Sequence, residues 1–539
     1  MFRNKRTMFG VILLLLTVLV IVTACTKDDS QKSKDESKEE ARAPGLSLAN
    51  EEWSETFQNS CLTCHAVGEN GKVERISDIR KTPEGWQDTI TRMQTMWGVQ
   101  ITDEEKAAIV QELSDKNGLA PGETEKVLYW LTESGSTIEP VTEEYNKIES
   151  SCIACHAGGR SLAQYRTEDE WMKLKDFHIG MSPAMIYQMR TVKWEEEADQ
   201  ILAYMASIHP YGTDEWEQWK DEKTDHEIAG TWRIVGRQPG SGLYSGHSEI
   251  SKKEDMYYEK RTLFMPDEQE KTSEGNVRKY AGYSLRSSLS DGDVKIRGVF
   301  NVKEDGEKIE GRWNEVNDKG KFADETYYKA DKTALLASWP SSIKTGTTET
   351  IHVIGAKLPD QLTTDSFVAS DGLVVDKVEK QDGDDVWVTV TAKETGEMML
   401  DLKDGGQPVK IIAFDKVDSI KVLPERGLAR LNYTGYQQSV QFEAIGYTTD
   451  HKEIGPLFVK WELQEQNEKN DDLKYVGQID ADSGLFTPGQ GGPNPERTWS
   501  SNNTGYVTVQ ASYQDPTTKE KMTGEGTLFI TLPDYVYIK

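Results

Sequence analysis

Cysteine, basic residues and long apolar runs are all scarce in this chain of 539 residues. The sequence has five cysteines, and its 63 Lys and Arg face 91 Asp and Glu, which gives a formal charge of −28. Because contacts to phosphates need clusters of Lys and Arg, this charge argues against a nucleic-acid-binding protein. The chain is too long for one hydrophobic core, so we expect three or four domains.

The longest apolar run lies at the N-terminus and is too short to span a membrane comfortably. It follows the basic segment MFRNKR and ends in VTAC at Cys25, a sequence that resembles the bacterial lipobox. In lipoproteins, cleavage before this cysteine leaves its thiol to carry lipid. We therefore expect residues 1–24 to be a lipoprotein signal peptide and Cys25 to be lipidated. An ordinary signal peptide with a chance cysteine is the alternative.

Residues 25–44 are rich in charged side chains, poor in apolar ones and free of aromatic ones. This composition predicts a disordered tether. Since no other apolar run is long enough to cross a bilayer, we expect an exported protein, anchored by lipid at the outer face of the cytoplasmic membrane. Export also makes disulfides an option for the remaining cysteines.

The other four cysteines lie in two copies of one pattern, CLTCH at 61–65 and CIACH at 152–156. On a helix, cysteines three residues apart share a face, and the histidine lies beside them. This spacing predicts covalent attachment of haem c, with two thioether bonds and one axial imidazole for each iron. The predicted residues are Cys61, Cys64 and His65 for the first haem, and Cys152, Cys155 and His156 for the second.

Two other interpretations of the cysteines are disulfides and zinc. Two CxxC disulfides would span adjacent turns, where they stabilise little, and they would leave both histidines unexplained. The distance in sequence from Cys64 to Cys152 is far outside the usual spacing of zinc ribbons. The pattern therefore favours haem.

An internal comparison predicts the second axial ligand of each iron. GWQDTITRMQTMWG follows the first pattern, and EWMKLKDFHIGM follows the second. When Trp86 is aligned with Trp171, Met93 lies opposite His178, each seven residues after its tryptophan. Seven residues are two helical turns, so each tryptophan shares a face with its ligand. We predict that the tryptophans pack on the haems and that Met93 and His178 bind iron.

Several methionines leave alternatives open at these positions. Met96 lies one turn from Met93, and Met181, Met185 and Met189 lie near His178. Methionines at helical spacing are often core residues, and His178 could instead be a surface residue. Because methionine raises the potential relative to histidine, unlike ligands would give the two haems different potentials.

The residue pattern of the sequence changes near residue 224. Residues 45–223 show helical periodicity and predict an all-α di-haem cytochrome c domain. The rest consists of short β-branched and aromatic segments separated by Gly, Asp and Asn, which is typical of antiparallel β-structure. The predicted domains are a β-barrel over 224–332 and immunoglobulin-like β-sandwiches over 333–415 and 416–539.

Residues 228–246, IAGTWRIVGRQPGSGLYSG, resemble the opening of the second domain in the α subunits of quinohemoprotein amine dehydrogenases. FHIGMSPAMIYQ (Phe177–Gln188) and GWQDTITRM resemble the haem domain of the same subunits. The order of domains also agrees, so the resemblance covers essentially everything after the tether.

This resemblance implies an electron-transfer subunit that does not itself oxidise the amine. In the family it joins a β-propeller subunit and a small γ subunit whose cysteine tryptophylquinone performs the oxidation. Electrons then reach one bis-histidine haem and one histidine/methionine haem. All five cysteines are already assigned here, so we expect the quinone on another chain.

The lipobox departs from the soluble periplasmic form of the family, so the external acceptor is open: a cytochrome, a copper protein or a terminal oxidase. Other functions consistent with the motifs are a di-haem cytochrome c peroxidase and an electron carrier for another exported dehydrogenase. A binding protein with accessory haems is a third class.

Overall fold

The computed structural model describes residues 53–125, 143–148, 151–152, 158–181, 183, 186, 193–303, 306–405, 407–433, 436–466, 471–498 and 500–532. The predicted signal peptide, Cys25 and the tether lie outside these ranges. Cys155, His156, Met185 and Met189 also lie outside them. In the part of the chain that is described, no helix has the length and apolar character needed to cross a bilayer.

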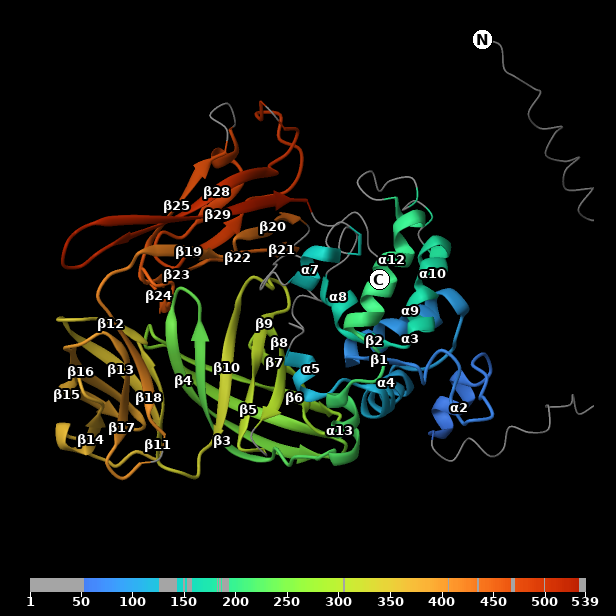
Figure 1. The fold of residues 1–539 in the computed structure, drawn as a ribbon, viewed down its shortest axis with the longest axis horizontal. Helices are drawn as coiled ribbons and strands as arrows, with labels where there is room; N and C mark the ends of the chain where they lie inside the picture. Colours follow the sequence, from blue (N-terminus) through green and yellow to red (C-terminus); the bar gives the residue numbers. More distant parts are fainter. Residues whose placement is uncertain are drawn as a thin grey trace, which may run out of the picture. The chain divides into compact units, whose positions relative to one another are not determined.

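The first part of the described chain combines helices with a small sheet (Figure 1). β1 (Ile79–Lys81) pairs antiparallel with β2 (Gln164–Arg166), with Ile79 opposite Arg166. The helices are α2 (Glu55–Cys61), α3 (Pro83–Trp97), α4 (Asp103–Asn117), α5 (Pro121–Glu125), α7 (Glu143–Ile148), α8 (Gly158–Leu162), α9 (Glu168–Met172), α10 (Leu174–Met181), α12 (Trp194–Ile208) and α13 (Asp214–Glu222).

The prediction of an all-α domain here is wrong, because β1 and β2 are strands. Each strand is only three residues long, and its pairing partner lies far away in the sequence. A strand this short has no periodicity of its own, so only the fold reveals it. Strands are also more abundant than helices over the described chain as a whole.

Local signals set several helix ends as expected. The Thr102 side chain accepts from the Glu105 backbone, and the Glu105 side chain accepts from the Thr102 backbone, which forms a capping box at the start of α4. The helix ends at Asn117, before Gly118. The amphipathic segment Trp194–Ile208 forms α12 and buries Trp194, Ala198, Leu202 and Met205.

The predicted β-barrel is confirmed. Eight antiparallel strands close on themselves in the order β10-β3-β4-β5-β6-β7-β8-β9. Buried and accessible residues alternate along β5, as expected when one face of each strand points into the barrel. The strands are β3 (Gly230–Gln238), β4 (Gly242–Lys253), β5 (Met256–Phe264), β6 (Glu270–Tyr280), β7 (Ser284–Asp291), β8 (Val294–Lys303), β9 (Lys308–Glu315) and β10 (Phe322–Lys329).

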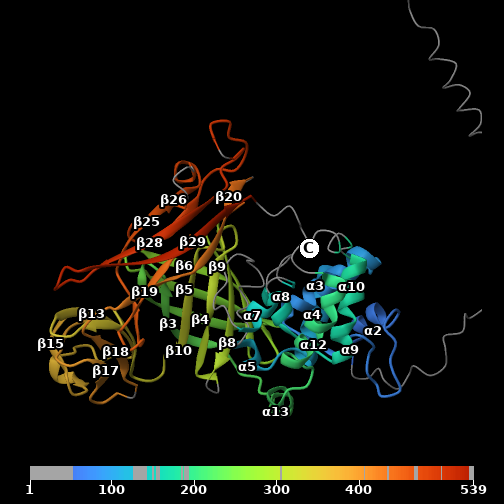
Figure 2. The ribbon, with the colours of Figure 1, turned by 45° about the horizontal axis from the view of Figure 1, so that its top comes forward.

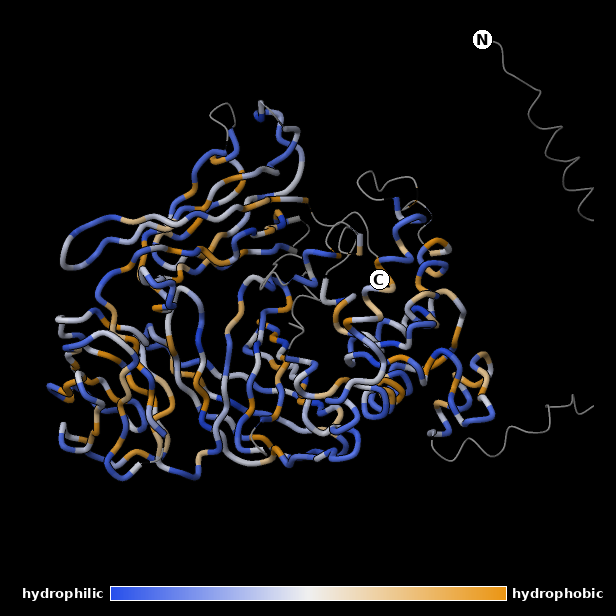
Figure 3. The backbone as a smooth tube through the Cα atoms, in the orientation of Figure 1, coloured by the Kyte–Doolittle hydropathy of each residue, from blue (hydrophilic) through white to orange (hydrophobic). Residues whose placement is uncertain are grey.

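Two four-stranded sheets follow, in the orders β11-β13-β16-β15 and β12-β18-β17-β14. They share one hydrophobic core, and Figure 3 shows apolar and polar residues mixed along their strands. Alternate residues of β16 enter this core. The strands are β11 (Ala334–Trp339), β12 (Ser342–Lys344), β13 (Thr348–Ala356), β14 (Phe367–Ala369), β15 (Leu373–Asp382), β16 (Asp385–Ala392), β17 (Gly396–Leu402) and β18 (Val409–Phe414).

The last part has three sheets around one core, rather than the two of a simple sandwich. The largest sheet has the order β21-β20-β29-β28-β25. The strands are β19 (Ser419–Leu423), β20 (Arg426–Tyr433), β21 (Tyr436–Gln438), β22 (Val440–Gln441), β23 (Glu443–Tyr447), β24 (Glu453–Pro456), β25 (Lys460–Glu465), β26 (Gly477–Ile479), β27 (Leu485–Pro488), β28 (Gly505–Gln514) and β29 (Lys521–Thr531).

Polar groups of the barrel form hydrogen bonds with the helical part. Arg286 on β7 donates two hydrogen bonds to the Glu84 carboxylate at the start of α3. The Tyr283 hydroxyl donates to the Leu119 carbonyl at 2.9 Å, and the Ala281 backbone N–H donates to the Asp115 carboxylate at 2.6 Å. These bonds fix the first turn of α3 and the end of α4, and Met93 lies on α3 between these two points.

Candidate haem-binding site

The first cysteine pattern lies where α2 ends. The backbone N–H groups of Cys64 and His65 both donate to the Cys61 carbonyl, at 3.2 and 3.0 Å. The chain therefore turns tightly through the pattern and keeps both sulfurs and the imidazole close together. Neither Cys61 nor Cys64 forms a disulfide among the described residues, so both sulfurs are left for thioether bonds.

His65 is oriented by a backbone carbonyl. Its Nδ1 lies 3.0 Å from the Glu74 carbonyl oxygen. A carbonyl only accepts, so in the neutral ring Nδ1 carries the proton and Nε2 keeps its lone pair. Histidines that bind metals are held in this way by their second nitrogen. The tautomer at His65 therefore suits ligation of iron through Nε2.

Cys61 packs against the hydrophobic core that contains Phe57, Trp86 and Ile90. Burial, with smaller effects of Glu112 and Cys64, raises the pKa of the Cys61 thiol to about 12. The shift records how far this sulfur lies inside the apolar core. Within the described ranges, no group of three or more His, Cys, Asp or Glu side chains gathers as a metal-binding cluster.

Trp86 and Trp171 occupy matching environments in two halves of this region. Each is 2% exposed. The Trp86 indole N–H donates to the Asn117 carbonyl at 3.1 Å, and the Trp171 indole N–H donates to the His209 carbonyl at 2.9 Å. These acceptors lie at the ends of α4 and α12. The internal repeat inferred from the sequence therefore extends to these two helices.

The residues before the two tryptophans also correspond. Thr82 follows β1 and caps α3, and Thr167 follows β2 and caps α9. Each hydroxyl accepts a backbone N–H three residues later. Each half thus runs strand, capping threonine, helix and tryptophan. Figure 1 shows β1 beside β2, where the two halves meet, and Figure 2 shows helices of both halves, α3 and α4 with α9, α10 and α12, grouped together.

Met93 lies on α3, two turns after Trp86, and is half-buried. Met96 and Trp97 in the last turn are 46% and 73% exposed. The helix ends at Gly98, whose φ of 71° favours glycine. Met96 and Trp97 are large apolar side chains beside the predicted ligand, and a haem on this face would cover them. This apolar surface therefore suits the binding of a haem.

His178 lies on α10, which is separated from α9 by Lys173 alone. The Lys173 N–H donates to the Asp169 carbonyl, and the Phe177 N–H donates to the Lys173 carbonyl, so the helical path continues across the break. The His178 Nδ1 lies 2.7 Å from the Leu174 carbonyl oxygen. As at His65, this leaves the Nε2 lone pair of the neutral ring for a metal.

The surroundings of His178 favour its neutral form. Burial lowers its pKa, and the positive charges of Arg166 and Arg92 add to this effect, while the Leu174 carbonyl opposes it. The Trp194 ring lies 5.5 Å from the imidazole, measured between centroids. A neutral imidazole is the form that binds iron. Met181, the alternative ligand, is the last residue of α10 and is half-buried.

The second cysteine pattern is described only at its first residue. Cys152 packs against the cluster that contains Ile148 and Trp171, as Cys61 packs against the cluster that contains Trp86. Burial raises the pKa of the Cys152 thiol, although hydrogen bonds from Ser151 and Ser161 oppose the shift. The predictions for Cys155 and His156 fall on residues outside the described ranges.

The segments that carry the two distal ligands contact each other. The Arg92 guanidinium lies 5.9 Å from the centroid of the Phe177 ring. Arg92 precedes Met93, and Phe177 precedes His178. Arg160, which follows the second pattern, also pairs with Asp88 on α3 at 2.7 Å. The two predicted iron sites are therefore on adjoining segments, an arrangement suited to electron transfer between them.

Sequence reasoning missed two buried cations in this region. Lys81 and Arg166 are 5% and 6% exposed. Burial lowers the pKa of Lys81 well below its ordinary value, with further effects of Arg166 and Arg92. Burial lowers the pKa of Arg166 to about 10. Each cation lies five residues before its tryptophan, a spacing that the internal alignment contained.

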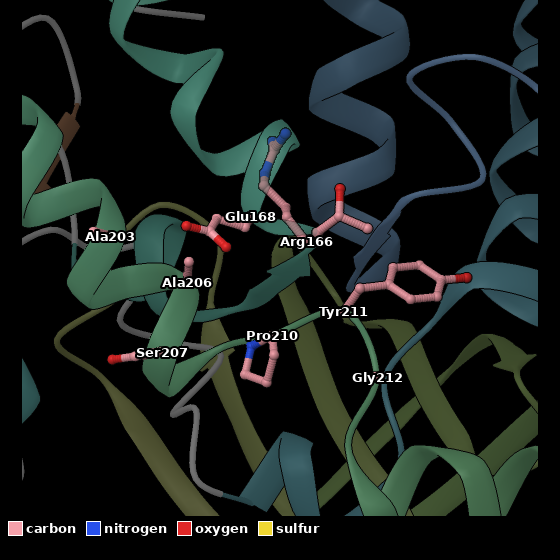
Figure 4. A pocket seen from close by; sticks show the side chains of 9 residues that line it. Arg166, Glu168, Ala203, Ala206, Ser207, Pro210, Tyr211 and Gly212 are labelled. Atoms are coloured by element: carbon pink, nitrogen blue, oxygen red, sulfur yellow. The ribbon is translucent and has the colours of Figure 1, made fainter.

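A shallow surface hollow of about 540 Å³ lies beside β2 and the end of α12. Arg166 contributes to its wall, but Figure 4 shows the guanidinium pointing away from Ser207 and Pro210. The charge of Arg166 is therefore directed towards the helices and not into this hollow.

Three profiles of known families match the chain. Residues 52–216 match the profile "Quinohemoprotein amine dehydrogenase A, alpha subunit, haem binding". Residues 225–324 match domain II of the same alpha subunit, and residues 420–538 match its domain IV. The match over 52–216 contains both cysteine patterns, both tryptophans and both predicted distal ligands.

Comparison of whole chains adds little. No curated protein matches at a significant level. A redesigned beta barrel is similar at 12% identity, with 19% of this chain and 90% of that chain covered and a TM-score of 0.17. Domains 1–6 of the surface layer protein SbsC are similar at 9% identity, with 87% and 97% covered and a TM-score of 0.18. Such low scores support no functional argument.

The family profiles cover the haem-binding region, the barrel and the last domain in the order in which an alpha subunit carries them. The chain therefore belongs to the family of quinohemoprotein amine dehydrogenase alpha subunits, and its first part is the haem-binding part.

Proposed function

We propose that this chain is the di-haem c electron-transfer subunit of an exported amine dehydrogenase. In this proposal, Cys61 and Cys64 hold the first haem, with His65 and Met93 as axial ligands. The corresponding residues for the second haem are Cys152, Cys155, His156 and His178. A haem c supplies one-electron transfer at iron, and its axial ligands set the potential.

The observation that carries the proposal is the repetition of one arrangement in two halves. In each half, a buried tryptophan shares a hydrophobic cluster with the first cysteine of the pattern. The predicted ligand follows that tryptophan by seven residues. His65 and His178 both direct Nδ1 to a backbone carbonyl, which supports Nε2 as the metal-binding atom.

Family membership and the N-terminal sequence support a proposal for the partners and the location. We infer that the electrons come from a cysteine tryptophylquinone on a separate small subunit, in a complex with a β-propeller subunit. We further infer that the haems pass them to an external redox protein, and that lipid on Cys25 anchors the chain at the outer face of the cytoplasmic membrane.

Two measurements on protein isolated from its host test the proposal. Mass spectrometry of peptides with CLTCH and CIACH is expected to find one covalent haem on each. Addition of a primary amine to the isolated complex is expected to reduce both haems, whereas the separated chain stays oxidised. Absence of porphyrin at either pattern, or haems that no primary amine reduces in the complex, would refute it. Peroxide turnover would favour a peroxidase instead.

A further inference from the structure

The two faces of the β1–β2 sheet differ in how their buried charges are balanced. Arg80 and Tyr165 are opposite each other and point to one face, whereas Lys81 and Arg166 point to the other. Arg80 donates to both oxygens of Glu123, at 2.6 and 2.9 Å. The first face is therefore neutral.

The second face carries two buried cations that share one buried carboxylate at a distance. The charge of Glu170 acts on both Lys81 and Arg166, but its oxygens pair with Lys173 and Arg75. Lys81 Nζ donates to the Thr89 hydroxyl at 2.7 Å. The Nε and Nη2 atoms of Arg166 donate to the Gln164 side-chain oxygen, at 2.9 and 2.8 Å. Neither cation forms an ion pair with any of the described residues. A buried charge is costly unless an opposite charge accompanies it, so an anion bound at this face would stabilise both cations.

A third cation adds to the requirement. Arg92 Nη2 donates at 3.1 Å to the Thr89 hydroxyl that also accepts from Lys81. Two positive groups on one hydroxyl repel each other strongly in a partly dehydrated site. The nearby carboxylates Asp88 and Glu170 already pair with Arg160 and Lys173. An anion held between these cations would remove the repulsion.

The two unpaired cations are equivalent in the internal repeat. Lys81 precedes Trp86 by five residues, and Arg166 precedes Trp171 by five. Lys81 Nζ lies 5.3 Å from the Trp86 ring centroid, and the Arg166 guanidinium carbon lies 5.7 Å from that of Trp171. Each half thus places one buried cation beside the tryptophan that precedes its predicted iron ligand. There is one such cation for each predicted haem.

We propose that Lys81 and Arg166 each bind a propionate carboxylate, Lys81 that of the first haem and Arg166 that of the second. The inference rests on the proposed function, since it requires both haems. An ammonium or guanidinium group forms strong, charge-assisted hydrogen bonds with a carboxylate. Each cation would also favour the reduced iron and so raise the potential of its haem.

The test is potentiometric titration of the purified holoprotein with Lys81→Gln or Arg166→Gln. Glutamine keeps a hydrogen-bonding side chain but removes the charge. Each change is expected to lower the potential of one haem, with an approximately tenfold shift in its ratio of reduced to oxidised form, or about 59 mV for one electron. Lys81→Arg and Arg166→Lys keep the positive charge, so the haem potentials of these variants are expected to stay close to those of the unsubstituted protein.

Lys220→Gln is the matched control, because Lys220 is half-exposed on α13 and pairs with Glu217. Its potentials are expected to equal those of the unsubstituted protein. Potentials that stay unchanged in both glutamine variants, or shift no more than in this control, overturn the inference. Resonance Raman spectra of the unsubstituted protein provide a measurement that needs no variant: propionate bending bands insensitive to D₂O at both haems also overturn it.

These outcomes separate the inference from the proposed function. Absence of covalent haem defeats the proposed function. If both haems have the expected ligands but their potentials do not change on substitution of Lys81 and Arg166, only the assignment of the propionate partners is wrong.

Discussion

The buried ion pair between Arg80 and Glu123 makes the strongest prediction about stability. Arg80 is fully buried, and Glu123 is 1% exposed. The Glu123 carboxylate also accepts from the Ala120 backbone and the Thr213 hydroxyl, while Arg80 donates to the Tyr211 carbonyl. The pair therefore ties β1 in the first half to the segment that follows α12 in the second.

Glu123→Gln leaves the Arg80 charge buried without a counter-charge, which costs about 3–5 kcal/mol. For a unit of this size, each kcal/mol corresponds to about 2–4 °C, so we expect the haem-binding part to melt about 6–20 °C lower. Burial opposes ionisation of Glu123, but the hydrogen bonds and charge of Arg80 outweigh it and lower its pKa. The stabilisation is therefore present above about pH 4.3, the ordinary pKa of glutamate, and is lost as pH falls through the lowered value.

Differential scanning calorimetry with parallel Soret absorbance measures this transition. The double variant Arg80→Met with Glu123→Gln is expected to recover part of the loss, because it removes the unpaired charge and keeps an acceptor for Ala120. Asp199→Asn is the control, since it removes an exposed pair with Lys175 that contributes about 0.2–1 kcal/mol. A Glu123→Gln variant that melts like the control would refute the reasoning.

Three further predictions concern the ligands and the junction between barrel and sandwich. Met93→Ala is expected to abolish the near-infrared methionine–iron band and Met96→Ala to leave it; the reverse result places the ligand one turn later. His178→Ala is expected to give one high-spin haem, and an unchanged absorption spectrum assigns the ligand elsewhere. Asp385→Asn removes the carboxylate that pairs with the buried Arg233, and we expect a loss of about 1.5–3 kcal/mol in calorimetry at neutral pH. Burial opposes ionisation of Asp385, but hydrogen bonds and charge from His352 and Arg233 outweigh it and lower its pKa. The difference in stability between the variant and the unsubstituted protein should therefore vanish as pH falls through this lowered pKa. A difference that persists in acid contradicts the assignment.

Much of the candidate site was predictable from local sequence, because local interactions specify it. Thr102 with Glu105 marks the start of α4, and the apolar spacing of Trp194–Ile208 marks α12. The alignment of Trp86 with Trp171 predicted equivalent tryptophans, which the structure finds with the same burial and the same type of indole hydrogen bond. The iron ligands themselves stay predictions.

The sheet between the two halves was not predictable in this way. β1 and β2 have three residues each, and their pairing depends on contacts between distant segments. Lys81 and Arg166 look like ordinary surface residues in the sequence. Their burial follows from that pairing, which turns them inwards together.

The sequence by itself determined the cysteine patterns, the barrel and the family, because covalent attachment motifs and strand periodicity depend on residues that are close together in the sequence. The tertiary structure alone decided which charges are buried, which carbonyls hold His65 and His178, and how the two halves meet. Burial and pairing of charge depend on all the segments that surround a residue, and no local pattern contains that information.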